Sequence, residues 1–268
     1  MAAQDGTVGK ALEVLDQVAG FDRPVRFTEL LSRSAYPKAT LYRLLQTLTS
    51  QSMLYYDADR QTYAPGPRLV RLAHAAWRQF SLAPVARPFV EALAREVGQT
   101  VHLAQLDHGQ VLYVDKRNPA DPIEMFAQAG KVGPAYCTGV GKAMLACLDE
   151  PALEDALARQ SYHRFTDGTL TSRDALLSEL AEIRACGHAH DREEHEPGII
   201  CIAAAIRART GRPLGGLSIT TSVERLDLRS LEAHLPRLKS TAAAIAEEAE
   251  AWRFPDMSAT RPLPMEAK

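Results

Sequence analysis

Two segments of this 268-residue chain carry side chains that suit ligand binding or catalysis. The first is Gly139-Val-Gly-Lys142, in which glycines precede a lysine as they do in phosphate-binding loops. A P-loop needs a glycine at position 136 and a hydroxyl residue at position 143, where this chain has Tyr136 and Ala143. A GxGxxG pattern fails at Met144, so we expect no nucleotide cofactor. A loop that leads into a helix N-terminus, whose free amides attract anions, is the better interpretation.

The second segment combines several titratable side chains: His188, His190, Asp191, Glu194 and His195. Their spacing matches no standard zinc set and no cysteine pair completes one, so a solvated loop is expected rather than a metal site. The same side chains could serve acid–base chemistry in a metal-dependent hydrolase. However, no nucleophile elbow, HExxH or paired-carboxylate motif accompanies them, and we therefore predict no catalytic residue.

The composition bounds the class of protein. Hydrophobic residues make up 46% and charged residues 24%, which excludes wholesale disorder and fibrous repeats. Lys+Arg 31 against Asp+Glu 33 gives a net charge of -2, so any nucleic-acid-binding surface must be local. No apolar run approaches the roughly 18 residues of a membrane span, and no signal-peptide core is present. The four cysteines form no CxxC pair, and we expect a soluble cytoplasmic protein with reduced thiols and no membrane association.

Residues 1–66 are predicted to form three short helices and a hairpin. Thr28 is a plausible N-cap for the second helix, and Pro37 suits the first turn of the third. In the third helix an i, i+3, i+4, i+7 stripe marks the buried face: Leu41, Leu44, Leu45 and Leu48. The β-prone runs 53–56 and 61–63 flank a polar tip, as in a hairpin. This set of elements is typical of a winged helix-turn-helix.

A change of composition at Pro65-Gly66-Pro67 marks the expected domain boundary. A linker helix over 67–80 and an α+β domain over 81–254 are predicted to follow, with a loose tail over 255–268. Strands are expected at 100–106, 111–116, 123–128, 200–207 and 214–221. Helices are expected from about Pro84 to Gly98 and at 141–148, 172–186 and 228–252, the last broken at Pro236.

The charge pattern of the first domain predicts a DNA-binding face. No acidic residue lies between Leu31 and Tyr56. With the leucine stripe turned inward, Arg43 could bond guanine and Gln46 could pair with adenine, while Lys38 and Arg60 suit phosphates. The predicted DNA-binding residues are Thr28, Lys38, Ala39, Thr40, Tyr42, Arg43, Gln46 and Arg60. A winged-helix module that binds protein instead of DNA remains the alternative.

Three motifs resemble those of the IclR family of bacterial transcriptional regulators. They are the segment Phe27–Leu45, the segment Gly139–Ala146 and the pattern Gly187-x3-Asp-x2-Glu-x6-Cys-Ile-Ala-x2-Ile206. The chain departs from the last signature directly after it, where Arg207-Ala208 replace an aromatic residue or His followed by Asp or Asn.

The resemblance implies a winged helix-turn-helix, a linker helix and a GAF/PAS-like effector-binding domain with an antiparallel sheet. It also implies a homodimer or dimer of dimers that controls a catabolic operon, which we expect to be a repressor. The double-stranded operator DNA should be a pseudo-palindrome with half-sites about 34 Å apart, or a multiple of that distance.

The resemblance further implies an effector cavity lined by Asp191, Cys201, Ser218 and Thr220. Ser218 and Thr220 are two apart in a predicted strand and so face one side together. Gly139 and Val140 are expected to precede a helix that begins near Gly141, so that their amides favour a carboxylate. Apolar walls are expected from Met125 and Phe126. We therefore predict a small organic acid as effector; the alternative is that the two hydroxyls only satisfy backbone groups at a strand end.

Overall fold

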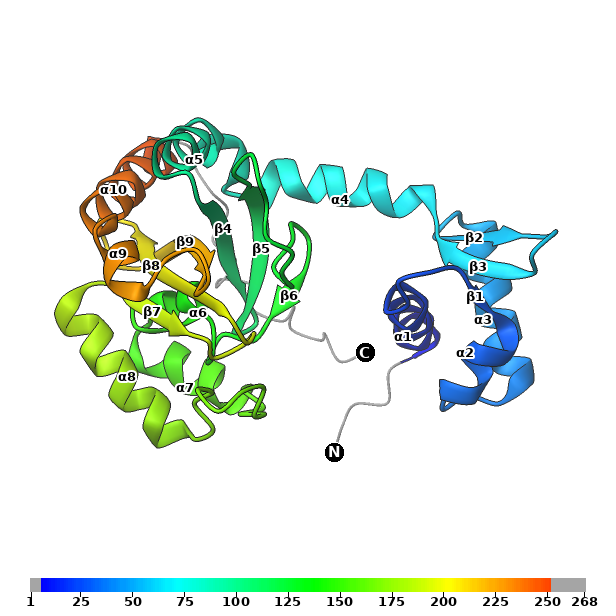
Figure 1. Ribbon diagram of the computed structural model, residues 1–268. Coiled ribbons are helices and arrows are strands. Elements are labelled where there is room, and N and C mark those ends of the chain that lie inside the picture. The colour runs from blue at the N-terminus through cyan, green and yellow to red at the C-terminus, as the bar shows by residue number, and fades with distance from the viewer. Residues whose placement is uncertain (1–5, 252–268) are drawn as a thin grey trace, which may run out of the picture. The chain divides into compact units, whose positions relative to one another are not determined.

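The structure is a computed structural model that describes residues 6–251 (Figure 1). Its chain forms two compact units, of which the first ends at Arg78 and the second begins at Gln79. The predicted tail over 255–268 lies outside the described residues. In the described part of the chain, no helix is long and apolar enough to cross a membrane.

The first unit combines short helices with a small antiparallel sheet. Its elements are α1 (Thr7–Ala19), β1 (Val25–Arg26), α2 (Phe27–Arg33), α3 (Lys38–Ser50), β2 (Leu54–Asp57), β3 (Thr62–Pro65) and α4 (Pro67–Phe80). The strand order is β1-β3-β2, so the predicted hairpin β2-β3 gains a third strand that the sequence did not indicate. This is the arrangement of a winged helix-turn-helix.

The core of the first unit follows the predicted leucine stripe. Leu41 and Leu45 of α3 are fully buried against α1 and the sheet, as the helical spacing predicts. The N-cap prediction for Thr28 is wrong, because α2 begins at Phe27, two residues earlier than that cap implies, and Arg26 occupies the cap position. There the carboxylate of Glu29, at the third helical position, accepts a hydrogen bond from the Arg26 amide at 3.1 Å, as in a capping box.

The second unit is an α+β domain built on one antiparallel sheet, as predicted. Its elements are α5 (Ala83–Val97), β4 (Thr100–Asp107), β5 (Gln110–Arg117), β6 (Val132–Gly133), α6 (Gly139–Leu145), α7 (Glu150–Ala158), α8 (Arg173–Cys186), β7 (Ala189–Arg192), β8 (Ile199–Arg207), β9 (Pro213–Ser222), α9 (Leu228–Glu232) and α10 (Leu235–Ala251). The strand order is β6-β5-β4-β9-β8-β7. In Figure 1, α5 and α10 cover one face of this sheet, and α6, α7 and α8 lie on the other.

Several predicted elements of the second unit need correction. The segment expected to be a strand at 123–128 is irregular, and the short strand β6, which was not predicted, pairs with the edge of β5 that β4 leaves free. The loop expected after α8 contains the edge strand β7, which pairs with β8. Helix α6 begins at Gly139, not near Gly141, and α7 was not predicted. Pro236 lies in the first turn of α10, where proline is tolerated, so the helix break lies before it.

Candidate functional site

The predicted DNA-binding residues lie on α2, α3 and the hairpin. Of the predicted residues on α3, Lys38, Ala39, Tyr42, Arg43 and Gln46 are exposed, while Thr40 is half-buried. Arg60 is exposed in the hairpin turn, and Thr28 is exposed on α2. The polar face of α3 is therefore free to enter a groove of DNA.

A groove of about 800 Å³ runs beside the start of α3. Of the predicted residues, Thr28, Lys38, Ala39 and Tyr42 line it. The sequence did not indicate its other lining residues: Arg26, Phe27, Tyr56, Gln61 and Tyr63. Aromatic rings form part of its wall, since the Tyr56 and Tyr63 centroids lie 4.8 Å apart. The pair Tyr55-Tyr56 in the hairpin was the available signal for this wall.

The second unit contains a small cavity, which we call the central cavity, between α6 and strands β4, β8 and β9. All predicted effector residues except Phe126 line it: Met125, Gly139, Val140, Asp191, Cys201, Ser218 and Thr220. Residues not predicted for it also line it: His102, Tyr113, Ala127, Thr138, His195, Glu196 and Ile199. The cavity has a volume of about 30 Å³, which is room for about two water molecules.

Two strands supply the polar wall of the cavity. His102 of β4 lies opposite Ser218 of β9 in the antiparallel register. The imidazole Nδ1 lies 3.2 Å from Thr220 Oγ1, and the Ser218 and Thr220 hydroxyls lie 3.3 Å apart. Burial, helped by Lys116, lowers the pKa of His102 to about 3, so the ring is neutral at pH 7. The hydroxyls therefore belong to a side-chain cluster within the sheet.

Asp191 brings a carboxyl group to the opposite side of the cavity. Its Oδ1 accepts a hydrogen bond from the Glu194 amide at 2.8 Å. Burial, together with the nearby Glu194 carboxylate, raises the pKa of Asp191 to about 8. The group is therefore largely protonated at pH 7 and can donate a hydrogen bond as well as accept one. Burial likewise raises the pKa of the neighbouring Cys201 thiol, which stays protonated.

The Gly139–Lys142 segment has a packing role. A Cβ atom at Gly139 would lie 2.4 Å from Cys201 Sγ, and one at Gly141 would lie 2.4 Å from the Ala135 carbonyl oxygen. Glycine at both positions therefore lets α6 approach β8 and the preceding turn. These close approaches account for the two glycines without a bound phosphate.

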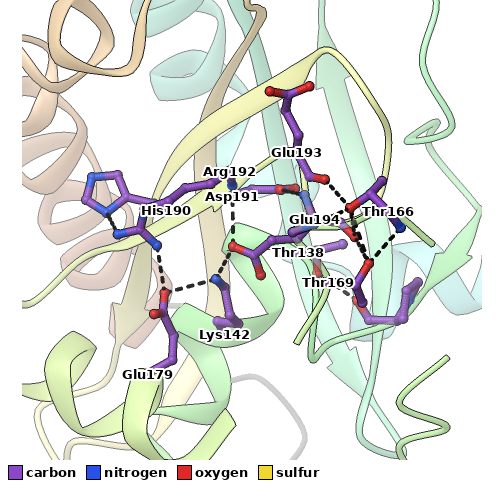
Figure 2. A network of polar contacts seen from close by, with 12 residues as sticks. Thr138, Lys142, Thr166, Thr169, Glu179, His190, Asp191, Arg192, Glu193 and Glu194 are labelled. Atoms are coloured by element: carbon purple, nitrogen blue, oxygen red, sulfur yellow. Dashed lines mark hydrogen bonds and ion pairs between the residues drawn. The ribbon is translucent and has the colours of Figure 1, made fainter. Parts of the chain in front are cut away.

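Lys142 is fully buried between two carboxylates (Figure 2). Its Nζ lies 2.5 Å from Glu194 and 3.0 Å from Glu179 of α8. Burial raises the pKa of Glu194 despite the Lys142 ammonium group. For the less buried Glu179, burial acts in the same direction, but Lys142 and Arg192 hold its pKa below the ordinary value. The lysine thus ties α6 to α8 and to the loop after β7.

The loop after β7 is also held through its backbone (Figure 2). The Thr166 hydroxyl donates to the Glu193 carbonyl and the Thr169 hydroxyl to the Glu194 carbonyl, both at 2.6 Å. The two threonines precede α8, so distant parts of the chain fix the loop. These bonds hold Asp191 and the residues that follow it against the cavity.

Phe126 lies beside the cavity but does not line it. Its amide donates to the Glu196 carboxylate at 2.9 and 3.0 Å, and its ring packs edge-on against His195 with centroids 5.0 Å apart. The predicted role of Phe126 as an apolar wall is therefore not supported by this geometry. Instead, its backbone and ring fasten the 125–127 segment over the cavity.

The histidines of the 188–195 segment do not converge. His190 Nε2 pairs with Glu232 of α9 at 2.8 Å, and His195 lies between the rings of Phe126 and Phe165. Among the residues that the structure describes, no group of three His, Cys, Asp or Glu side chains is arranged to hold a metal. The geometry thus gives no support to a metal-dependent hydrolase.

Comparisons with known proteins agree with the fold and motifs. Residues 74–247 match the family described as bacterial transcriptional regulator IclR C-terminal, and residues 7–58 match the IclR helix-turn-helix domain. The chain is 30% identical over 247 residues to the HTH-type transcriptional regulator KdgR of Escherichia coli, covering 91% of this chain and 94% of KdgR. It is 29% identical over 219 residues to the transcriptional repressor IclR of the same organism, covering 81% and 80%.

A solved structure shares the fold. This is an IclR homologue from Microbacterium hydrocarbonoxydans complexed with 4-hydroxybenzoate, with a TM-score of 0.77 and 22% identity over 92% of this chain and 100% of that one. The matched families and relatives are transcriptional regulators and not enzymes. From its two matched domains and its similarity to these regulators, the chain belongs to the IclR family of DNA-binding bacterial transcriptional regulators.

Proposed function

We propose that this regulator is a cytoplasmic repressor of a catabolic operon and responds to a small organic acid. In this proposal a homodimer, or a dimer of dimers, places two copies of α3 in successive major grooves of a pseudo-palindromic operator. Similarity to the transcriptional repressor IclR of E. coli supports the repressor role. The exposed basic residues of α3 support the mode of DNA binding.

The observation that carries the ligand proposal is the set of hydrogen-bond donors around the central cavity. The Ser218 and Thr220 hydroxyls and the protonated Asp191 carboxyl group face the same space. A carboxylate accepts hydrogen bonds only, so these donors suit it. Met125 and Ala127 supply an apolar surface for the body of the acid.

A cavity of about 30 Å³ does not hold an organic acid without rearrangement. The bonds from the Phe126 amide to Glu196 and from Lys116 Nζ to the Ala127 carbonyl are among the contacts that must open for the 125–127 segment to move. Ligand binding then favours the opened arrangement of the domain. An effect on DNA binding follows only if the acid has different affinities for the DNA-competent and DNA-incompetent arrangements.

Isothermal titration calorimetry with 4-hydroxybenzoate, lactate and pyruvate tests this proposal. An acid that binds the unaltered protein should lose at least ten-fold in affinity with Ser218→Ala and with Asp191→Ala, since each removes a donor. Ser240→Ala, a hydroxyl deletion on the exposed side of α10, is the matched control and should bind normally. Equal affinity in all four proteins would place the effector site elsewhere.

A further inference from the structure

A second hollow lies in the effector-binding domain, at the end of α6 away from the central cavity. It has a volume of about 340 Å³, at the lower end of the range for small-molecule sites. Three elements meet there: the C-terminal end of α6, the turn from α8 into β7, and the end of β8. We call it the α6 C-terminal pocket. The central cavity adjoins Gly139 and Val140 at the start of the same helix.

The floor of this pocket is hollow because its residues are small. Ala143 and Ala146 of α6 and Ala205 of β8 present only methyl groups to it. Ile183 of α8 adds an aliphatic wall, and Cys147 lies at the side with its thiol half-buried. Such a floor suits a compact apolar group.

The rim of the pocket is cationic. Arg184, Arg207 and His188 line it, and no acidic residue does. Arg184 Nε donates to the Ala146 carbonyl at 2.9 Å, which fixes this guanidinium at the edge of the pocket. In the described part of the chain, neither arginine has a carboxylate within 4.0 Å, although the other arginines of the two units often do. The charge of both groups is therefore available to a ligand.

The electrostatics at Cys147 show that the two arginines act on the same space. Burial raises the pKa of the Cys147 thiol, while Arg207 and then Arg184 oppose that shift. Both positive charges thus reach the thiol from different elements, β8 and α8. Guanidinium groups bind carboxylates and phosphates through paired N–H donors, whose geometry fits the two oxygens of such a head group.

We propose that the α6 C-terminal pocket is a second ligand site, which binds a small organic anion with a carboxylate or phosphate head group at Arg184 and Arg207 and a compact apolar body on the alanine floor. This site is independent of the acid proposed for the central cavity. The two sites share α6, so a ligand at one can affect the other only through that helix and its neighbours.

Cys147 provides a reporter for this pocket. In a Cys186→Ser background, which removes the exposed thiol nearby, alkylation of Cys147 is followed by mass spectrometry with anionic iodoacetate and neutral iodoacetamide. The rate ratio of iodoacetate to iodoacetamide should fall at least three-fold with Arg207→Gln, since attraction between unit charges a few ångströms apart is lost. Arg209→Gln is the matched control, because Arg209 lies two residues further on, is exposed and pairs with Glu250. It should leave the ratio unchanged.

Competition identifies the head group. Benzoate or phenyl phosphate at millimolar concentration should slow alkylation of Cys147 by iodoacetamide, whereas neutral benzyl alcohol should not. This protection should disappear with Arg207→Gln and persist with Ser218→Ala, which separates the pocket from the central cavity. Protection by benzoate alone assigns a carboxylate ligand, and protection by phenyl phosphate alone assigns a phosphate.

Three results would overturn the proposal. They are equal protection by benzyl alcohol, protection that survives Arg207→Gln, and a rate ratio that Arg207→Gln does not change. Thermal unfolding of each variant checks that the fold is intact, and the exposed position of Arg207 makes a folding defect unexpected.

Discussion

At Gly139, which lines the central cavity, α6 packs closely against β8. An added Cβ would meet Cys201 Sγ at 2.4 Å and the Ala203 side chain at 3.2 Å. Overpacking of this kind forces backbone shifts and costs about 1–3 kcal/mol. The packing of α6 against β8 at the cavity wall therefore leaves no room for a side chain at Gly139.

Gly139→Ala should accordingly lower the free energy of unfolding by about 1–3 kcal/mol in urea denaturation. Because the closest clash is with the thiol, Gly139→Ala combined with Cys201→Ala should be more stable than the sum of the single changes predicts. Strict additivity of the two changes would show that the contact with Cys201 is not the cause.

Asp191 gives the domain a pH dependence. Its folded pKa of about 8 exceeds the ordinary value, so the folded state binds a proton that the unfolded state lacks between about pH 4 and pH 8. Its contribution to stability is therefore complete below about pH 4 and is lost as the pH rises through about 8.

Asp191→Asn keeps an oxygen for the Glu194 amide but cannot ionise. Its unfolding free energy relative to the unaltered protein should rise between pH 5 and pH 8, by at most about 1.4 kcal/mol per pH unit for one proton. Denaturant titrations at several pH values measure this difference. A constant difference across this range would mean that Asp191 has an ordinary pKa in the folded protein.

At the scale of elements, Lys142 joins α6 to α8 and to the loop after β7. Lys142→Met keeps the length and apolar stem of the side chain but leaves Glu194 buried without its partner. Removing one member of a buried ion pair costs about 3–5 kcal/mol, so the domain should lose stability by that order. Arg159→Met, which breaks an exposed pair with Asp155 on the surface, is the control.

A loss for Lys142→Met no greater than that for Arg159→Met would contradict a structural role for the buried pair. The smaller loss expected on the surface follows from solvent screening of exposed charges. Both variants are measured by the same thermal or urea unfolding experiment.

Helix α3 carries the predictions for DNA. Arg43→Ala should weaken binding to the operator by about 1–3 kcal/mol per lost base contact while affecting random DNA little. Lys38→Ala should weaken binding to both and reduce the salt dependence by about one unit. Fluorescence anisotropy with operator and random DNA over a range of salt concentrations distinguishes base reading by Arg43 from phosphate binding by Lys38. Equal losses on the two DNAs for Arg43→Ala would remove its role in reading bases.

The elements that the sequence predicted well are those with a clear local pattern. The leucine stripe of α3 could be placed because one face of the helix is buried. The strand containing Ser218 and Thr220 is buried on both faces, and its run of β-branched residues at 219–221 was the signal. The 123–128 run was also predicted to be a strand. However, the Phe126 amide donates to the side chain of Glu196, 70 residues away, and not to a neighbouring strand. Such long-range partners leave no local pattern.

The same limit applies to the sites. The motifs, the family resemblance and a predicted strand together gave seven lining positions of the central cavity. His102 and Tyr113 were missed because each is a single residue in an ordinary strand. Burial decides the protonation of Asp191, and a sequence does not give the depth of a residue. The cationic rim of the α6 C-terminal pocket likewise joins residues from two distant elements.

At the scale of the whole molecule, a net charge of -2 is compatible with DNA binding because the basic residues are concentrated locally. The first unit contains the exposed face of α3, and the second contains the central cavity, whose side chains can donate hydrogen bonds to a carboxylate. Regulation requires that occupancy of the cavity changes the affinity of the assembled protein for its operator.

The most direct test of this account is the operator affinity of the full chain with and without the acid that binds in calorimetry, measured by fluorescence anisotropy. We predict that the acid weakens operator binding at least ten-fold in the unaltered protein. Ser218→Ala, whose operator affinity without acid is normal, should need at least ten-fold more acid for the same effect. An acid that binds the protein but leaves operator affinity unchanged, or that acts equally on Ser218→Ala, would contradict it.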